Sequence, residues 1–141
     1  MKLFFLLLFS LCFAFGAEPV AVVKELQGNA TVKRNALLYP LHKGDYLYRG
    51  DTLQTTKNTD IGLSFNDGTR IAIGSETLFV IDEYLFAPAQ KAFQFNVHLP
   101  KGSIVFESGR IGKLAPEKVK IKVPQGIIGI RGTKFAVEVE E

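Results

Sequence analysis

Hydrophobic and polar residues alternate along most of the chain after residue 20. Within residues 61–65 every second side chain is apolar, and the same period of two recurs at residues 93–99, 119–123 and 135–139. A period of two is typical of a β-strand with one buried face. Apolar residues at helical spacing never continue for the ten or so positions that a helix needs. The pattern therefore predicts an all-β chain.

Short turn sequences separate the expected strands. The Asn-Asp-Gly-Thr sequence at residues 66–69 has left-handed turn chemistry and predicts a hairpin between residues 61–65 and 71–73. We expect further turns at residues 43–45, 49–51, 99–102 and 124–126. Residues 78–86 are apolar at both odd and even positions, which predicts a strand covered on both faces. The expected fold is one domain of short, mostly antiparallel strands in a sandwich, roll or barrel, with a β-solenoid-like roll as the alternative.

The first sixteen residues differ from the rest. One lysine, Lys2, precedes an apolar run over residues 3–15, and small residues follow it. This pattern predicts a signal peptide at residues 1–16 and a mature domain at residues 17–141 that is exported and soluble after cleavage. An uncleaved membrane anchor is the alternative, although the run is shorter than the roughly 20 residues that span a bilayer. Cys12 is the only cysteine of the chain, so the mature protein has no disulfide partner.

Charge is concentrated near the end of the chain. Residues 110–134 hold seven basic residues and one acidic residue, although the whole chain carries only +3. Lys118, Lys120 and Lys122 share one face of an expected strand and could meet an acidic protein, an anionic glycan or an anionic lipid. The alternative is a solvated face, or lysines that guard a sheet edge. We expect no nucleic acid partner for an exported domain.

Glycine recurs at every third position of residues 126–132, and Arg131 is the one charged residue among small and apolar neighbours. Such glycines allow bends, bulges or close backbone approach. We interpret Arg131, with Gly132 and Thr133 beside it, as a structural latch paired with Asp51, Asp67 or a carbonyl, or else as a partner contact.

Catalytic chemistry has no visible place in the sequence. Asp45, Asp51 and Asp67 stand beside glycines, without the alternate acidic positions of a calcium loop, and we interpret them as turn caps. His42 and His98 have no partner at metal-ligand spacing. There is no nucleophile elbow and no glycine-rich phosphate loop. We expect no enzyme activity, no metal and no cofactor.

A set of positions spread over residues 27–139 gives the chain a family resemblance. The residues are Gly28, Ala30, Val32, Arg34, Leu41, Gly44, Asp45, Gly50, Asp51, Leu53, Thr55, Leu63, Ser64, Phe65, Asp67, Gly68, Thr69, Arg131, Gly132, Thr133, Phe135 and Val137. In this order, with the closing Arg-Gly-Thr-x-Phe, they resemble the FecR domain family. The resemblance implies an all-β periplasmic domain.

The best-known FecR regulators relay a signal from an outer-membrane transporter to a cytoplasmic sigma factor, through an anti-sigma segment and a membrane span that precede the domain. Here the expected signal peptide stands in that place. The resemblance therefore implies a stand-alone sensing or interaction domain with an envelope or membrane protein partner, and it puts direct anti-sigma activity in doubt. A structural or adhesion-linked envelope module, binding acidic glycan or lipid through the basic strand face, is the alternative.

Overall fold

β-strands make up 60% of the residues and helices 9%, so the all-β prediction is confirmed. The computed structural model describes residues 18–130 and 133–140. The predicted signal peptide, Arg131 and Gly132 lie outside the described residues. Within the described residues, no helix is both long and apolar enough to cross a membrane.

Twelve strands and three short helical segments follow one another within the described residues. The strands are β1 (Ala21–Gln27), β2 (Ala30–Arg34), β3 (Leu37–Pro40), β4 (Tyr46–Leu47), β5 (Thr52–Thr55), β6 (Asp60–Phe65), β7 (Arg70–Ile73), β8 (Leu78–Ala87), β9 (Ala92–Glu107), β10 (Val119–Val123), β11 (Gly126–Gly129) and β12 (Lys134–Val139). The helical segments are η1 (Pro88–Gln90), α1 (Arg110–Leu114) and η2 (Pro116–Lys118). The predicted hairpin is confirmed as β6 and β7.

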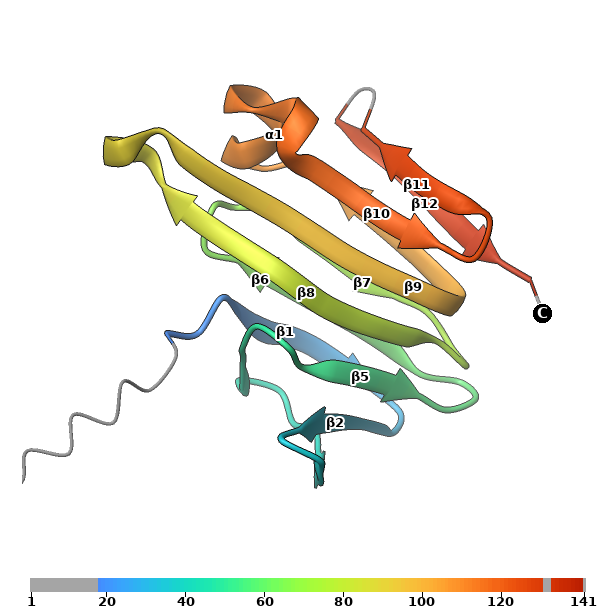
Figure 1. Ribbon diagram of the computed structural model, residues 1–141. Coiled ribbons are helices and arrows are strands. Elements are labelled where there is room, and N and C mark those ends of the chain that lie inside the picture. The colour runs from blue at the N-terminus through green and yellow to red at the C-terminus, as the bar shows by residue number, and fades with distance from the viewer. Residues whose placement is uncertain (1–17, 131–132, 141) are drawn as a thin grey trace, which may run out of the picture.

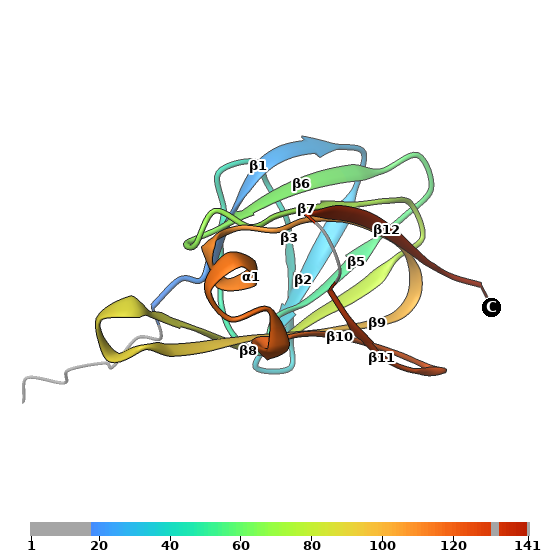
Figure 2. The same cartoon turned by 90° about the horizontal axis from the view of Figure 1, so that it is seen from above.

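The strands form one curled sheet with two facing halves (Figures 1 and 2). The β1 half has the order β4-β1-β6-β7-β9-β12. The β8 half has the order β3-β2-β5-β8-β9-β10-β11. All pairs are antiparallel except β9 with β10. The apolar faces of both halves enclose the core, and α1 lies between them at one end (Figure 2).

The two halves share β9, whose first part pairs with β8 and β10 and whose second part pairs with β7 and β12. The turn predicted at residues 99–102 is therefore wrong, because the strand bends there without ending. Gly102, with φ of +97°, supplies the left-handed backbone that the bend needs. The Ser103 amide after it donates to Thr77 Oγ1 at 3.0 Å.

The prediction that β8 is covered on both faces is also wrong. Its buried residues change from odd to even positions, since Phe79 and Ile81 are buried, and then Tyr84. The register with β9 shifts between Ile81 and Glu83, and a bulge of this kind moves the following side chains to the other face. Leu85 consequently stays exposed.

Asp67 does more than cap the β6–β7 turn. Its buried carboxylate accepts hydrogen bonds from the Thr69 hydroxyl at 2.8 Å and the Tyr84 hydroxyl at 3.0 Å. It also accepts a bond from the Ile111 amide at 3.0 Å, which ties the turn to α1. Burial, with the adjacent Asp67 carboxylate as a further cause, raises the pKa of Tyr84 far above its ordinary value.

Candidate functional site

The three predicted lysines lie in a row on the outside of the β8 half. Lys118 ends η2, and Lys120 and Lys122 alternate on β10 with the buried side chains of Val119 and Ile121. All three lysines are exposed, and none forms an ion pair with another described residue. The predicted one-sided strand is confirmed over residues 119–123, but Lys118 lies in η2 and not on the strand. We call these three lysines the basic row. Its role in binding stays a prediction.

Thr133 is exposed, and its carbonyl accepts a hydrogen bond from the Ser108 amide at 2.7 Å. The Asp51 carboxylate, one of the partners expected for Arg131, accepts bonds from Arg34. Asp67 has the partners described above. The latch formed by Arg131 and Gly132 lies outside the described residues and stays a prediction.

The surroundings of the basic row are mixed in charge. Across the sheet, Lys120 lies beside Asn96, which lies beside Glu83. Adjacent strands are about 4.8 Å apart, so Glu83 lies about two strand spacings from Lys120. On the other side, Lys122 is paired with Ile127, which is 66% exposed. The row is therefore a narrow cationic strip, about one strand wide.

A different surface carries the exposed aromatic residues. Half of the strongly exposed large apolar side chains among the described residues come from β3 and β4, namely Leu37, Leu38, Tyr39 and Tyr46. These strands are the edges of the two halves, on the side away from β11 and β12. The hollow between them has a volume of about 440 Å³. It is lined by Val32, Arg34, Tyr39, Pro40, His42, Asp45, Tyr46 and Tyr48, and we call it the tyrosine groove.

Local sequence explains how β3 reaches this place. Asn35 and Ala36 have φ of 52° and 64°, the two consecutive left-handed residues of a tight hairpin between β2 and β3. The register places Tyr39 opposite Val32, whose side chain is buried, so Tyr39 shares the inner face at the edge of the core. Leu41, which is 4% exposed, then anchors the chain in the core. Tyr39 thus stands at the rim of the core, whereas Leu38, paired with the exposed Lys33, points to the outer face.

Arg34 forms the fixed floor of the groove. Its Nε and Nη2 donate to the two oxygens of Asp51 at 2.9 and 2.7 Å, and its guanidinium lies 4.6 Å from the centre of the Tyr48 ring. Asp51 is fully buried and also accepts a hydrogen bond from the Tyr48 amide at 2.9 Å. The hydrogen bond to Asp51 holds the pKa of Arg34 above its ordinary value. A bidentate pair of this kind fixes the orientation of a cation that is still 32% exposed.

The sequence pattern alone did not predict this groove. The signal was present, because three of the four tyrosines of the chain fall within residues 39–48, next to two leucines. Apolar and aromatic residues of a short strand can be buried or exposed, and local sequence does not distinguish the two. Only the strand order shows that β3 is an edge.

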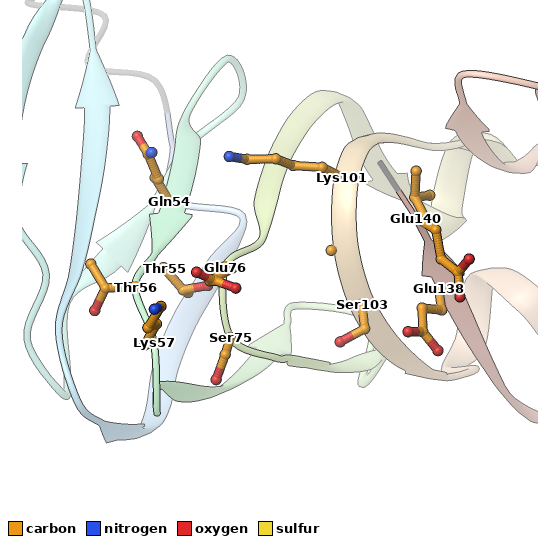
Figure 3. A pocket seen from close by; sticks show the side chains of 12 residues that line it. Gln54, Thr55, Thr56, Lys57, Ser75, Glu76, Lys101, Ser103, Glu138 and Glu140 are labelled. Carbon is orange, nitrogen blue, oxygen red and sulfur yellow. The ribbon is translucent and has the colours of Figure 1, made fainter.

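A larger hollow, of about 640 Å³, lies at the bend of β9 (Figure 3). Its rim carries both signs of charge, with Lys57, Lys101, Glu76, Glu138 and Glu140. The hydroxyls of Thr55 and Thr77 beneath it are already hydrogen-bonded to the backbone. Among residues 18–130 and 133–140, no three His, Cys, Asp or Glu side chains are placed to hold a metal ion.

Comparison with known proteins identifies the family of this chain. No curated protein matches the chain. A solved structure described as "Cell surface anchoring domain" is 27% identical, with a TM-score of 0.43, over 44% of this chain and 83% of that one. The model of the FecR protein family matches residues 51–141. This match includes Asp51, the β6–β7 hairpin and the closing strand, and it confirms the resemblance to this family. The chain belongs to the FecR protein family.

Proposed function

We propose that this protein is a non-catalytic periplasmic interaction domain that takes part in envelope signalling by binding an envelope protein through the tyrosine groove. The FecR family acts in envelope signalling, which supports the class of function. The matched segment begins at residue 51, after the groove residues 32–48. The assignment of the groove therefore rests on its geometry.

The exposed apolar and aromatic rim carries this proposal. Tyr39 and Tyr46 line the groove and are 43% and 60% exposed. Leu37 and Leu38, on the same sheet edge, are 57% and 67% exposed and lie outside its lining. Contiguous exposed apolar surface is uncommon on a soluble protein and marks sites of interaction. Tyrosine and arginine are the residues most enriched among those that dominate binding energy at protein interfaces. The groove supplies both types of residue in one place.

The groove also has the geometry to receive an extended peptide. Among the described residues β3 is hydrogen-bonded to β2 alone, which leaves its other edge open for an added strand. The tyrosine rings offer flat apolar contact. The bonds from Arg34 to Asp51 use Nε and Nη2, and Nη1 has no hydrogen bond to a described residue. Nη1 is thus the donor available for a carbonyl or carboxylate of the bound segment.

Cross-linking in intact cells, followed by recovery of the protein, tests this proposal. The double variant Tyr39→Ser with Tyr46→Ser should lose most of the cross-linked envelope partner. The matched control, Leu85→Ser with Leu114→Ser, removes two exposed apolar side chains elsewhere and should keep it. Equal recovery of the partner from both variants would refute the role of the groove.

The basic row supports a second candidate, an envelope module that binds acidic glycan or lipid. Its support is the exposure of three lysines on one face without an ion pair among the described residues. Replacement of Lys118, Lys120 and Lys122 by Gln should then weaken binding to anionic vesicles or glycans, more so at low salt. The control replaces the exposed Lys24, Lys43 and Lys57 by Gln. Glu83 nearby makes a broad anionic surface a poorer fit than a single peptide, so we rank this candidate second.

A further inference from the structure

The closing strand β12 has a free edge. Within residues 18–130 and 133–140 it is hydrogen-bonded to β9 alone, in a register that runs unbroken from Lys134 to Val139. It contains neither proline nor glycine. A long regular edge of this kind is a template for another strand.

The other edges of the sheet are less suited to a pairing along six regular residues, although β3 leaves room for a shorter segment. β4 has two residues, β3 ends at Pro40, and β11 begins and ends with glycine. Short edges, proline and glycine all weaken strand addition. Figure 1 shows β11 and β12 at the end of the molecule away from β2, and the strand order places β3 and β4 at the other ends of the two halves.

Hydrogen-bond parity identifies which groups β12 offers. The Ser108 amide donates to the Thr133 carbonyl, so these two residues form a hydrogen-bonded pair of the ladder with β9. Along two antiparallel strands, hydrogen-bonded pairs alternate with pairs whose amide and carbonyl groups point away from the partner strand. The amide and carbonyl groups of Lys134, Ala136 and Glu138 therefore point to the free edge. The side chains of these three residues are exposed, whereas Val137 and Val139 are buried.

The charges on the β12 edge complement those on the β12 edge of a second copy that runs antiparallel to it. In an antiparallel pair with Ala136 opposite itself, Lys134 of each copy lies opposite Glu138 of the other. Opposite charges directly across a strand pair are favourable, and the same residues would repel many other partners. Three facing pairs with two bonds each give about six backbone hydrogen bonds.

We propose that a second copy of this chain occupies the edge, so that two antiparallel β12 strands join the sheets across a two-fold axis at Ala136. The pairing also covers the rim of the core, where Val137 and Val139 are each 8% exposed and Phe135 is half-buried. Within the β1 half the tyrosine groove adjoins the opposite edge, β4, and stays accessible. The proposal does not depend on the proposed function.

A cysteine at the axis tests the register. Cα atoms of a hydrogen-bonded antiparallel pair are about 5.5 Å apart, within the range that a disulfide bridges. The full chain with Ala136→Cys should form a disulfide-linked dimer under mild oxidation. Ala72→Cys is the matched control, because Ala72 is exposed in the same cross-strand row, two strands away. Wild type, with Cys12 alone, gives the background. If Ala136→Cys forms no more disulfide-linked dimer than Ala72→Cys does, the proposal is overturned.

A charge exchange tests the pairing without cysteine. Lys134→Glu and Glu138→Lys should each weaken self-association about tenfold, since each places two like-charged pairs face to face. The double variant restores both opposite pairs and should dimerise as wild type does in sedimentation equilibrium. Thermal melting of each variant verifies that it is folded. A monomeric wild type, or a double variant no better than the singles, would refute the self-pairing and leave the edge to a strand of another protein.

Discussion

Asp67 shows how one residue can hold two distant parts of this fold together. Its carboxylate joins Thr69 and Tyr84 to the first turn of α1 through the Ile111 amide. The sequence predicted the turn at Asp67, because Asp-Gly after an alternating strand is a local signal. The bonds to Tyr84 and Ile111 could not be predicted, since they depend on elements 17 and 44 residues away.

Asp67→Asn should lower the free energy of unfolding by roughly 2–4 kcal/mol. The asparagine side chain has one acceptor oxygen where the carboxylate has two, and its NH2 group would face groups that are themselves hydrogen-bond donors. Asp60→Asn, at an exposed position on β6, is the control and should change it by less than about 0.5 kcal/mol. Urea unfolding measures both. Similar midpoints for the two variants would contradict the role given to Asp67.

Tyr84 predicts a specific loss of stability in alkali. Its pKa is raised in the folded protein, chiefly by burial, so the folded state keeps a proton that the unfolded state releases above its ordinary pKa of about 10. The stabilisation is fully present below that pH and is lost as the pH rises above it. Unfolding free energies measured between pH 8 and 11 should fall by up to about 1.4 kcal/mol per pH unit more in wild type than in Tyr84→Phe. Parallel curves would refute this effect.

At the scale of the element, alternation predicted the strands well and failed where a strand changes direction. The sequence Leu-Pro-Lys-Gly at residues 99–102 has the composition of a turn, yet β9 passes through it. A bend and a turn use the same residues, and only pairing with β7 and β12 beyond the bend distinguishes them. The bulge in β8 likewise could not be predicted, because a register shift depends on the partner strand. Without it, the apolar residues of β8 fall on both faces of the strand.

Gly102→Ala should therefore be costly. A Cβ at this position would overlap the Thr77 side chain and backbone, and the backbone is left-handed. We expect a loss of at least roughly 3 kcal/mol in unfolding free energy. Gly44→Ala is the matched control, with φ of +91° and no atom within 4 Å of the added Cβ, and should cost about 1–2 kcal/mol. Comparable losses by denaturant titration would show that the packing at the bend is unimportant.

At the scale of the whole molecule, the order of the strands decides which surfaces are free. Composition and period predict an all-β fold, but they do not specify that β3, β4, β11 and β12 are edges. For that reason the basic row could be found from the sequence and the tyrosine groove could not. Lysines at period two are visible in one stretch of sequence, whereas the groove combines residues of β2, β3 and β4 with residues between β3 and β4 and just after β4.

The central claim is that an envelope protein binds at the tyrosine groove. A photo-cross-linking amino acid placed in living cells at Tyr39, at Lys120 or at Ala72 samples the groove, the basic row and the outer face of the β1 half respectively. The account predicts one discrete adduct with an envelope protein from position 39 and none of that size from positions 120 and 72. An adduct from position 120 alone, or none from position 39, would contradict it.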